Sequence, residues 1–249
     1  MEVWGGSISS STWNDIEKLQ KAFIRRHLGI KSTTPYVLLL LETGRRPIEV
    51  YAMVRVLRYV IRIRQMDDSR LPKKAWDAST CLQKTRKSKV LSTGWVLNMQ
   101  KWFKRWKVDR YLNMTPEDIC MDTFQIDLLR AYQAKHQSKG ADGKLAYYNM
   151  HIYPSCWESY MQNEAHTQPY IANPLSMASR RNIARLRTRS HNLAIETGAW
   201  KGQAREMRLC KLCDLQNVES EEHMIMLCPT YAHIRADFDI SWQGPSISF

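Results

Sequence analysis

The stretch YVLLLLETGRRPIEVYAMVRVLRYVIRIRQ, residues 36–65, decides the fold class. Residues 36–43 predict one helix, and Pro47, which suits the first turn of a helix, begins a second one that runs to about Gln65. Apolar side chains recur at helical spacing and predict a buried face: Val50, Val54, Leu57 and Ile61. Arginines on another face share the same spacing: Arg55, Arg58 and Arg62. Helices with one apolar and one charged face pack against other helices.

The helical period continues on both sides of this stretch. An N-terminal helix is expected to end at Gly29, with an apolar face made by Trp13, Ile16, Leu19, Phe23 and Ile24. Further helices are expected over residues 95–107, 116–138, 176–187 and 190–197. Strand-like alternation is rare, so the sequence predicts an all-α protein.

Glycines and prolines divide the chain. Gly140 and Gly143 flank the best internal break, while Pro154, Pro169 and Pro174 interrupt the segment that follows. We therefore expect a helical domain over 1–140, an irregular connecting segment over 141–175, and basic helices with a C-terminal module over 176–249.

The charge balance restricts the class of partner. The 249 residues contain 37 Lys and Arg against 24 Asp and Glu, a formal net charge of +13. Such an excess favours polyanions, because Lys and Arg displace counterions from phosphates. The longest clean apolar run, residues 36–41, is far shorter than the ~20 residues of a membrane span. With no basic, apolar leader at residues 1–6, we expect an intracellular protein, nuclear or cytoplasmic, without membrane contact.

A Cys-x-x-Cys pair near the C-terminus predicts a metal site. Cys210 and Cys213 are followed by His223 and then Cys228, and three thiolates with one imidazole suit tetrahedral Zn²⁺. His223 and Cys228 are five positions apart, which places them ~140° apart on an ideal α-helix. The helix must therefore stop before Cys228, and Pro229 favours that stop. The fold expected is an irregular helical bundle with a small C-terminal Cys-Cys-His-Cys zinc-binding module. Buried cysteines with an accidental Cys-x-x-Cys remain the alternative.

Two basic runs are candidates for nucleic-acid contact. Residues 180–211 carry nine basic against two acidic residues, and residues 84–110 carry nine against one. The residues expected to contact phosphates are Arg180, Arg181, Arg185, Arg187, Arg189, Arg208, Lys211, Lys84, Arg86, Lys87 and Lys89. Trp102 and Trp106 lie in the second run, where they favour core packing over stacking on bases.

Short segments at the two ends of the chain carry a family likeness, and they occur in the family's order. The N-terminal segments are EVWG (2–5), IEKLQKAF (16–23), LGIK (28–31), TP (34–35), LETGRRPI (41–48) and RY (58–59). The C-terminal segments are RLR (185–187), SHNLAIETG (190–198), RLCKLC (208–213), VESEEH (218–223), CPTY (228–231) and Arg235. With them the chain resembles the C-terminal region of reverse transcriptases encoded by non-LTR (LINE-like) retrotransposons of animals.

The resemblance implies a thumb and linker with a zinc-binding tail that grips RNA or DNA beside a polymerase. It implies Cys210, Cys213, His223 and Cys228 as the zinc ligands. It also implies that the polymerase aspartates lie before Met1, so that the chain is not itself an enzyme but a truncated, degenerate or domesticated copy.

Two other functions remain open from the sequence. The basic surface could bind an acidic protein partner in a structural remnant with no nucleic-acid role. The TGRRPIE segment (43–49) is similar to the first box of tyrosine recombinases, in which Arg45 would hold a phosphate, although no His-x-x-Arg box follows. Asp67 and Asp68 follow a basic helix, and we interpret them as part of a helix-terminating loop.

Overall fold

The computed structural model describes residues 10–84, 94–137, 143–152 and 167–237. Helices dominate these residues, and the strand-like geometry among them is limited to an isolated bridge between Leu209 and Val218. The predicted all-α fold is confirmed. The α-helices are α1 (Ser10–Leu28), α2 (Tyr36–Thr43), α3 (Ile48–Arg64), α4 (Leu71–Lys84), α5 (Trp95–Arg105), α6 (Met121–Gln137), α7 (Gly143–Tyr147), α9 (Pro169–Ala172), α10 (Met177–Arg187), α11 (Ala194–Trp200) and α12 (Ala232–Asp237). Shorter 3₁₀ or π turns are η3 (Asp109–Leu112), η4 (Pro116–Asp118), η5 (Tyr148–Ile152), η6 (Arg205–Met207), η7 (His223–Leu227) and η8 (Pro229–Tyr231).

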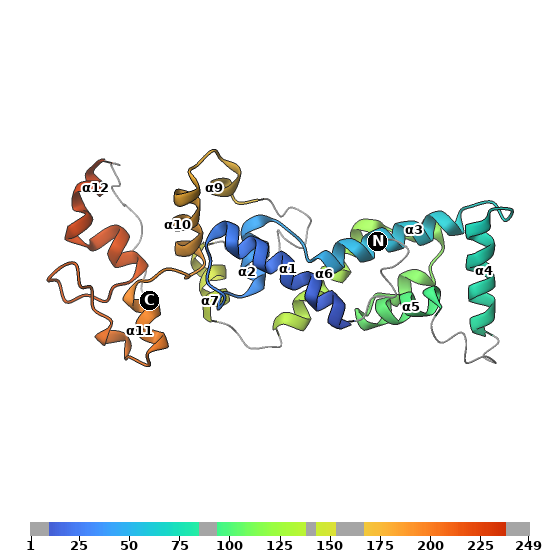
Figure 1. The fold of residues 1–249 in the computed structure, drawn as a ribbon, viewed down its shortest axis with the longest axis horizontal. Coiled ribbons are helices and arrows are strands. Elements are labelled where there is room, and N and C mark those ends of the chain that lie inside the picture. Colours follow the sequence, from blue (N-terminus) through green and yellow to red (C-terminus); the bar gives the residue numbers. More distant parts are fainter. Residues whose placement is uncertain (1–9, 85–93, 138–142, 153–166, 238–249) are drawn as a thin grey trace.

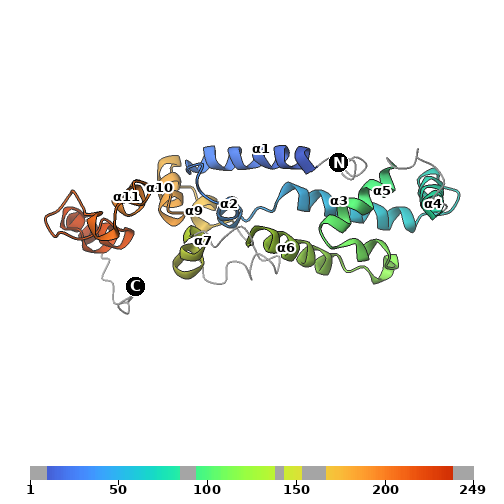
Figure 2. The ribbon, with the colours of Figure 1, turned by 90° about the horizontal axis from the view of Figure 1, so that it is seen from below.

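The molecule is elongated, with α4 at one end and α12 at the other (Figure 1). Viewed from below, α1 lies on one side of α2 and α3, and α6 and α7 lie on the other (Figure 2). Helix α1 packs against α2, α3 and α10, while α3 also packs against α6 and α4. Among the described residues, no helix has the length and apolar character that crossing a membrane requires.

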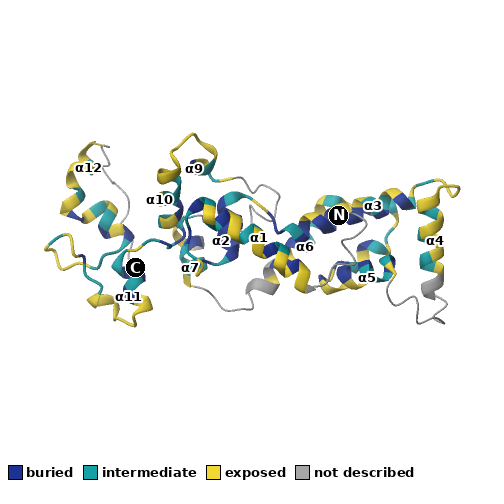
Figure 3. Cartoon of the chain, in the orientation of Figure 1, coloured by how far each residue is buried: buried dark blue, intermediate teal, exposed yellow. Residues whose placement is uncertain are grey.

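The core forms along α2 and α3. Every residue from Tyr36 to Glu42 is buried, and the buried positions of α3 include Val50, Val54 and Leu57 (Figure 3). Ile61 packs at the edge of this core, whereas the arginine face of α3 is exposed. The predicted orientation of this helix is therefore confirmed.

The expected apolar face of α1 is wrong in part. Trp13, Ile24 and Leu28 are buried, but Leu19 is 72% exposed and Phe23 is 63% exposed. The buried positions of α1 recur about every four residues along the helix, and one of them is Glu17. Its carboxylate accepts a hydrogen bond from the Tyr36 hydroxyl at 2.6 Å. The hydrogen bond between buried Glu17 and Tyr36 thus fixes the rotation of α1 about its axis, and this rotation leaves Leu19 and Phe23 exposed.

Trp102 of α5 and Trp106, which directly follows α5, are core residues, as their helical spacing favoured. Trp102 and Trp106 are buried, and their indole N–H groups both donate to Glu49 Oε1, at 2.7 and 2.9 Å. Trp102 also stacks on Trp13 at 5.2 Å between ring centroids. These rings are therefore not available for stacking on bases.

Two expected helix starts are wrong. Pro116 begins only the 3₁₀ turn η4, because Ile119 is extended and turns its side chain into the core, and α6 begins at Met121. The helix expected from 190 begins instead at Ala194. The preceding loop is held by Lys31, whose backbone N–H donates to Ser190 Oγ at 2.7 Å.

The predicted break at 140–143 falls mainly outside the described residues, so the three predicted domain ranges stay predictions. Helix α10, assigned to the C-terminal range, packs directly against α1.

Candidate metal centre and basic junction

Four side chains from two separate segments meet near the C-terminus. Cys210, Cys213, His223 and Cys228 each offer one ligand atom, and these atoms all lie within 4.8 Å of one another. The four predicted ligands are therefore close enough to hold a metal ion. Cys210, His223 and Cys228 are buried, and Cys213 is half-buried.

A short hairpin presents the first two cysteines. The Cys210 N–H donates to the Asn217 carbonyl at 2.9 Å, and the Glu219 N–H donates to the Arg208 carbonyl at 2.9 Å. Inside the hairpin, the Leu212 N–H points at Cys210 Sγ at 3.4 Å. An N–H directed at sulfur favours a thiolate, so the turn is arranged to carry negative charge on this ligand.

A π-helical turn presents the other two ligands. The Cys228 N–H donates to the His223 carbonyl at 2.7 Å, five residues back, instead of the four of an α-helix. The wider turn brings the two residues together despite a spacing that points them apart on an α-helix. Cys228 is extended, as expected before Pro229, and the Thr230 hydroxyl donates to the Leu212 carbonyl at 2.6 Å. The expected helix stop is thus correct, but the π turn that closes the site was not predicted.

The donor set fits a soft metal ion. His223 Nε2 lies 3.4 Å from Cys213 Sγ, so this ring nitrogen faces the thiols. Its Nδ1 is buried and has no hydrogen-bond partner among the described residues, so Nε2, which faces Cys213, is the ring nitrogen placed to serve as the ligand atom. Burial raises the pKa of the Cys210 thiol, so a bound cation would offset the cost of ionising it.

Charged side chains connect this site to the rest of the protein. His191 Nδ1 accepts from the Leu193 N–H at 3.3 Å, so Nε2 carries the ring proton and donates to Glu221 Oε1 at 2.8 Å. Burial by itself raises the pKa of Glu221, but this bond and the charge of Arg189 hold it below its usual value. Arg189 also lies 2.8 Å from Glu196 Oε1. Glu221, two residues before His223, is thus tied to the loop that follows α10.

The predicted arginine face of α10 packs on the end of α1. Arg181 donates to the carbonyls of Arg26 and His27, and Arg185 donates to the Gly29 carbonyl at 2.7 Å. These cations meet carbonyls that a helix leaves unpaired at its C-terminus. Gly29 has φ +63°, and a Cβ there would lie 3.0 Å from Arg185 Nη2 and 3.1 Å from Arg181 Cδ. The positive φ favours a glycine here, and a Cβ at this position would require the two arginine side chains to shift slightly.

Arg187 points into the protein. It lies 2.9 Å from Oε1 of Glu42, whose side chain is fully buried, and it donates to Gln168 Oε1 at 2.8 Å. The Tyr170 hydroxyl also donates to Glu42, at 2.6 Å. Arg187, predicted to contact phosphates, is thus engaged by partners within the chain.

The remaining predicted cations are dispersed. Arg180 donates to the Asn173 carbonyl at 2.8 Å, and Arg208 donates to the carbonyls of Gln203 and Ile195. Lys211 is exposed on the Cys-x-x-Cys loop. Lys84 ends α4, and its side chain is not described; Arg86, Lys87 and Lys89 lie outside the described residues.

The fold adds basic residues that sequence reasoning missed. Residues 18–41 and 167–195 each contain five Lys or Arg and no Asp or Glu, and α1 and α10 bring the two segments together. Arg25, Arg26 and Lys31 thereby join Arg181 and Arg185 in what we call the basic junction. The absence of acidic residues from 18–41 was the sequence signal that could have indicated this basic segment. That the segment lies against α10 is seen only in the tertiary structure.

Comparison with known proteins gives no match: no family model matches the chain, and neither a curated protein nor a solved structure matches it significantly.

Proposed function

We propose that the chain is a non-catalytic nucleic-acid-binding protein whose C-terminal module is stabilised by Zn²⁺. The basic junction is the observation that carries the proposal. Two acid-free segments, separated by the 125 residues from 42 to 166, place their cations on neighbouring helices. Such a concentration of positive charge binds phosphates through counterion release and does not require base recognition.

Zinc is proposed from the donor set. Three thiolates and one imidazole are ligands that Zn²⁺ accepts in closed, structural sites. Ideal bonds of ~2.3 Å to sulfur and ~2.1 Å to nitrogen place a sulfur and a nitrogen about 3.6 Å apart in a tetrahedron. The distance between Cys213 Sγ and His223 Nε2 is 3.4 Å, close to that value. When bound, zinc would supply folding energy to the module and no reaction chemistry.

The salt dependence of binding tests the proposed function. Metal-loaded protein and a fluorescein-labelled 12-nucleotide strand or duplex are mixed at 50–300 mM salt, and anisotropy gives the affinity. We expect the logarithm of the association constant to fall steeply with the logarithm of salt concentration. The Arg26→Gln variant, which removes an exposed charge of the junction, should reduce the slope by about one.

The matched control is Arg130→Gln, an exposed arginine on α6, which lies on the opposite side of α3 from α1 (Figure 2). It should leave both affinity and slope close to those of the wild type. Absent or salt-independent binding to both nucleic acids would contradict the proposal and favour a partner of another class.

A further inference from the structure

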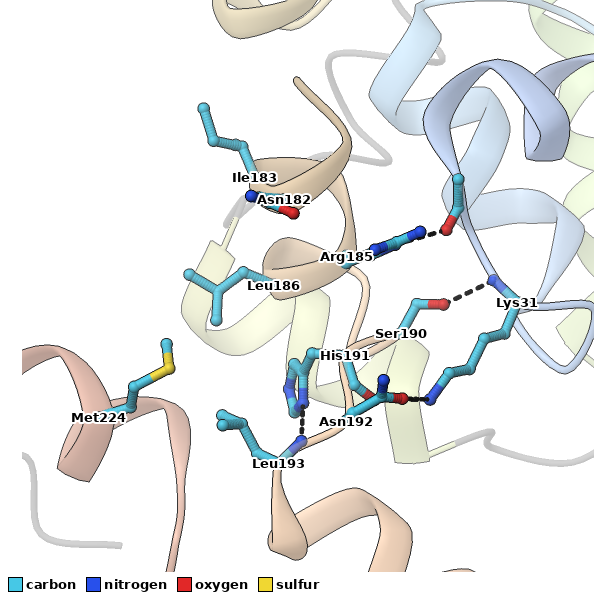
Figure 4. A pocket seen from close by; sticks show the side chains of 11 residues that line it. Lys31, Asn182, Ile183, Arg185, Leu186, Ser190, His191, Asn192, Leu193 and Met224 are labelled. Carbon is cyan, nitrogen blue, oxygen red and sulfur yellow. Dashed lines mark hydrogen bonds between the residues drawn. The ribbon is translucent and has the colours of Figure 1, made fainter. Parts of the chain in front are cut away.

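A cavity of about 570 Å³ lies at the basic junction, beside the metal-binding turn. Its wall includes α10, the loop 188–193, the segment that follows α1, and Met224 of η7 (Figure 4). The volume is within the range of ~300–1,000 Å³ that is usual for small-molecule sites. The proposed function uses the cations Lys31 and Arg185 on its wall but assigns no role to the cavity itself.

One side of the cavity is cationic. Arg185 uses Nε for the Gly29 carbonyl, and its terminal nitrogens make no hydrogen bond among the described residues. Lys31 Nζ donates to the His191 carbonyl at 2.7 Å and to Asn192 Oδ1 at 2.6 Å, which leaves one of its three donors. Burial, and then repulsion by Lys144, lower the pKa of Lys31. A bound anion would relieve that repulsion.

The opposite side is apolar and has amides at its edge. Figure 4 shows Ile183 and Leu186 on α10 and Met224 on η7, all on the side away from Lys31, with Leu193 below them. Asn182 and Asn192 stand at the rim, and an amide both donates and accepts hydrogen bonds. The side-chain amide of Asn182 makes no hydrogen bond among the described residues. A flat ring with apolar faces and polar edges would satisfy both kinds of surface.

We propose that this cavity holds one unpaired nucleotide of a single-stranded nucleic acid. The base lies between the apolar side chains, with its edge at the two amides, and the adjoining phosphate lies at Lys31 and Arg185. This inference rests on the proposed function and makes it more specific, because a base within a duplex cannot enter the cavity. Trp200 extends the same surface: the residue is 53% exposed, and Lys31 Nζ lies 4.3 Å from the centre of its ring. Aromatic rings beside cations are typical of surfaces that bind single strands.

Filling the cavity tests this inference. The metal-loaded Asn182→Trp variant should bind a labelled 12-nucleotide single strand about tenfold more weakly than the wild type, which is the loss expected from one displaced base. Its affinity for the 12-base-pair duplex should change by less than about twofold. The matched control is Ala178→Trp, one turn earlier on α10, exposed and outside the cavity wall. It should change neither affinity.

An Asn182→Trp variant that keeps wild-type affinity for the single strand, or that loses single strand and duplex equally, would overturn the inference and leave the proposed function standing. A wild-type protein that binds neither nucleic acid would overturn both. A second measurement needs no variant: a 12-mer with one 4-thiouridine is cross-linked to the wild-type protein by light. Cross-links in residues 182–193 or at Met224 support the cavity as the site, and cross-links confined to other residues contradict it.

Discussion

At the scale of single residues, the same kind of side chain has two uses in this protein. Arg187 is held by a buried carboxylate, whereas Arg26 is exposed on the end of α1. The sequence grouped Arg187 with the phosphate ligands because its neighbours are basic. Its partner, Glu42, lies 145 positions earlier, and no local pattern connects the two. Charge runs thus predict the sign of a surface better than they predict which of its residues face outward.

Replacing Arg187 with leucine should destabilise the protein by about 3–5 kcal/mol, because Glu42 would remain buried without its cation. Urea unfolding followed by circular dichroism gives the free energy of unfolding. The control Arg185→Leu removes an exposed arginine of the same helix and should cost about 1 kcal/mol or less. Replacing Glu42 and Arg187 together by leucine should recover part of the loss. A cost below about 1 kcal/mol for Arg187→Leu would contradict the buried ion pair.

At the scale of elements, the sequence predicts helices well where their own faces decide them. The stretch 36–65 specifies α2 and α3 because long apolar runs and a regular arginine face leave few alternatives. The prediction of helix starts fails where contacts between distant residues determine the backbone. Ile119 is extended and places its side chain in the core, and Ser190 is held by a hydrogen bond from the Lys31 N–H. The metal ligands were predicted from spacing alone, but the π turn depends on a backbone hydrogen bond that spacing does not indicate.

Ser220 precedes the short helix that becomes the π turn, and its hydroxyl accepts a hydrogen bond from the His223 N–H at 3.1 Å. The Ser220→Ala variant should lose about 1 kcal/mol of this cap and therefore bind zinc about fivefold more weakly in a competition with a chelating dye. The control is Ser176→Ala, which removes an equivalent cap of 3.0 Å at α10, far from the ligands in sequence. It should lower the stability of the protein by a similar amount and leave zinc affinity unchanged. Equal zinc affinities of the two variants would show that the cap does not position His223.

At the scale of the whole molecule, the buried residues form two separate centres. The main hydrophobic core extends from Trp13 to Ala184, and His223, Cys210 and Cys228 are buried outside it. The C-terminal module has few apolar residues of its own to bury, and Leu212, Leu215 and Leu227 are exposed. A metal ion bound by buried ligands would supply the folding energy that this small module lacks. The basic junction and its cavity lie where the two parts meet.

Metal content tests the central claim most directly. Native mass spectrometry of protein purified without chelators should give one zinc ion per chain. The Cys213→Ser variant should carry none, whereas Cys120→Ser, which changes an exposed cysteine at the start of α6, should still carry one. A wild-type chain without zinc, or a Cys213→Ser variant with a full zinc ion, would contradict the account.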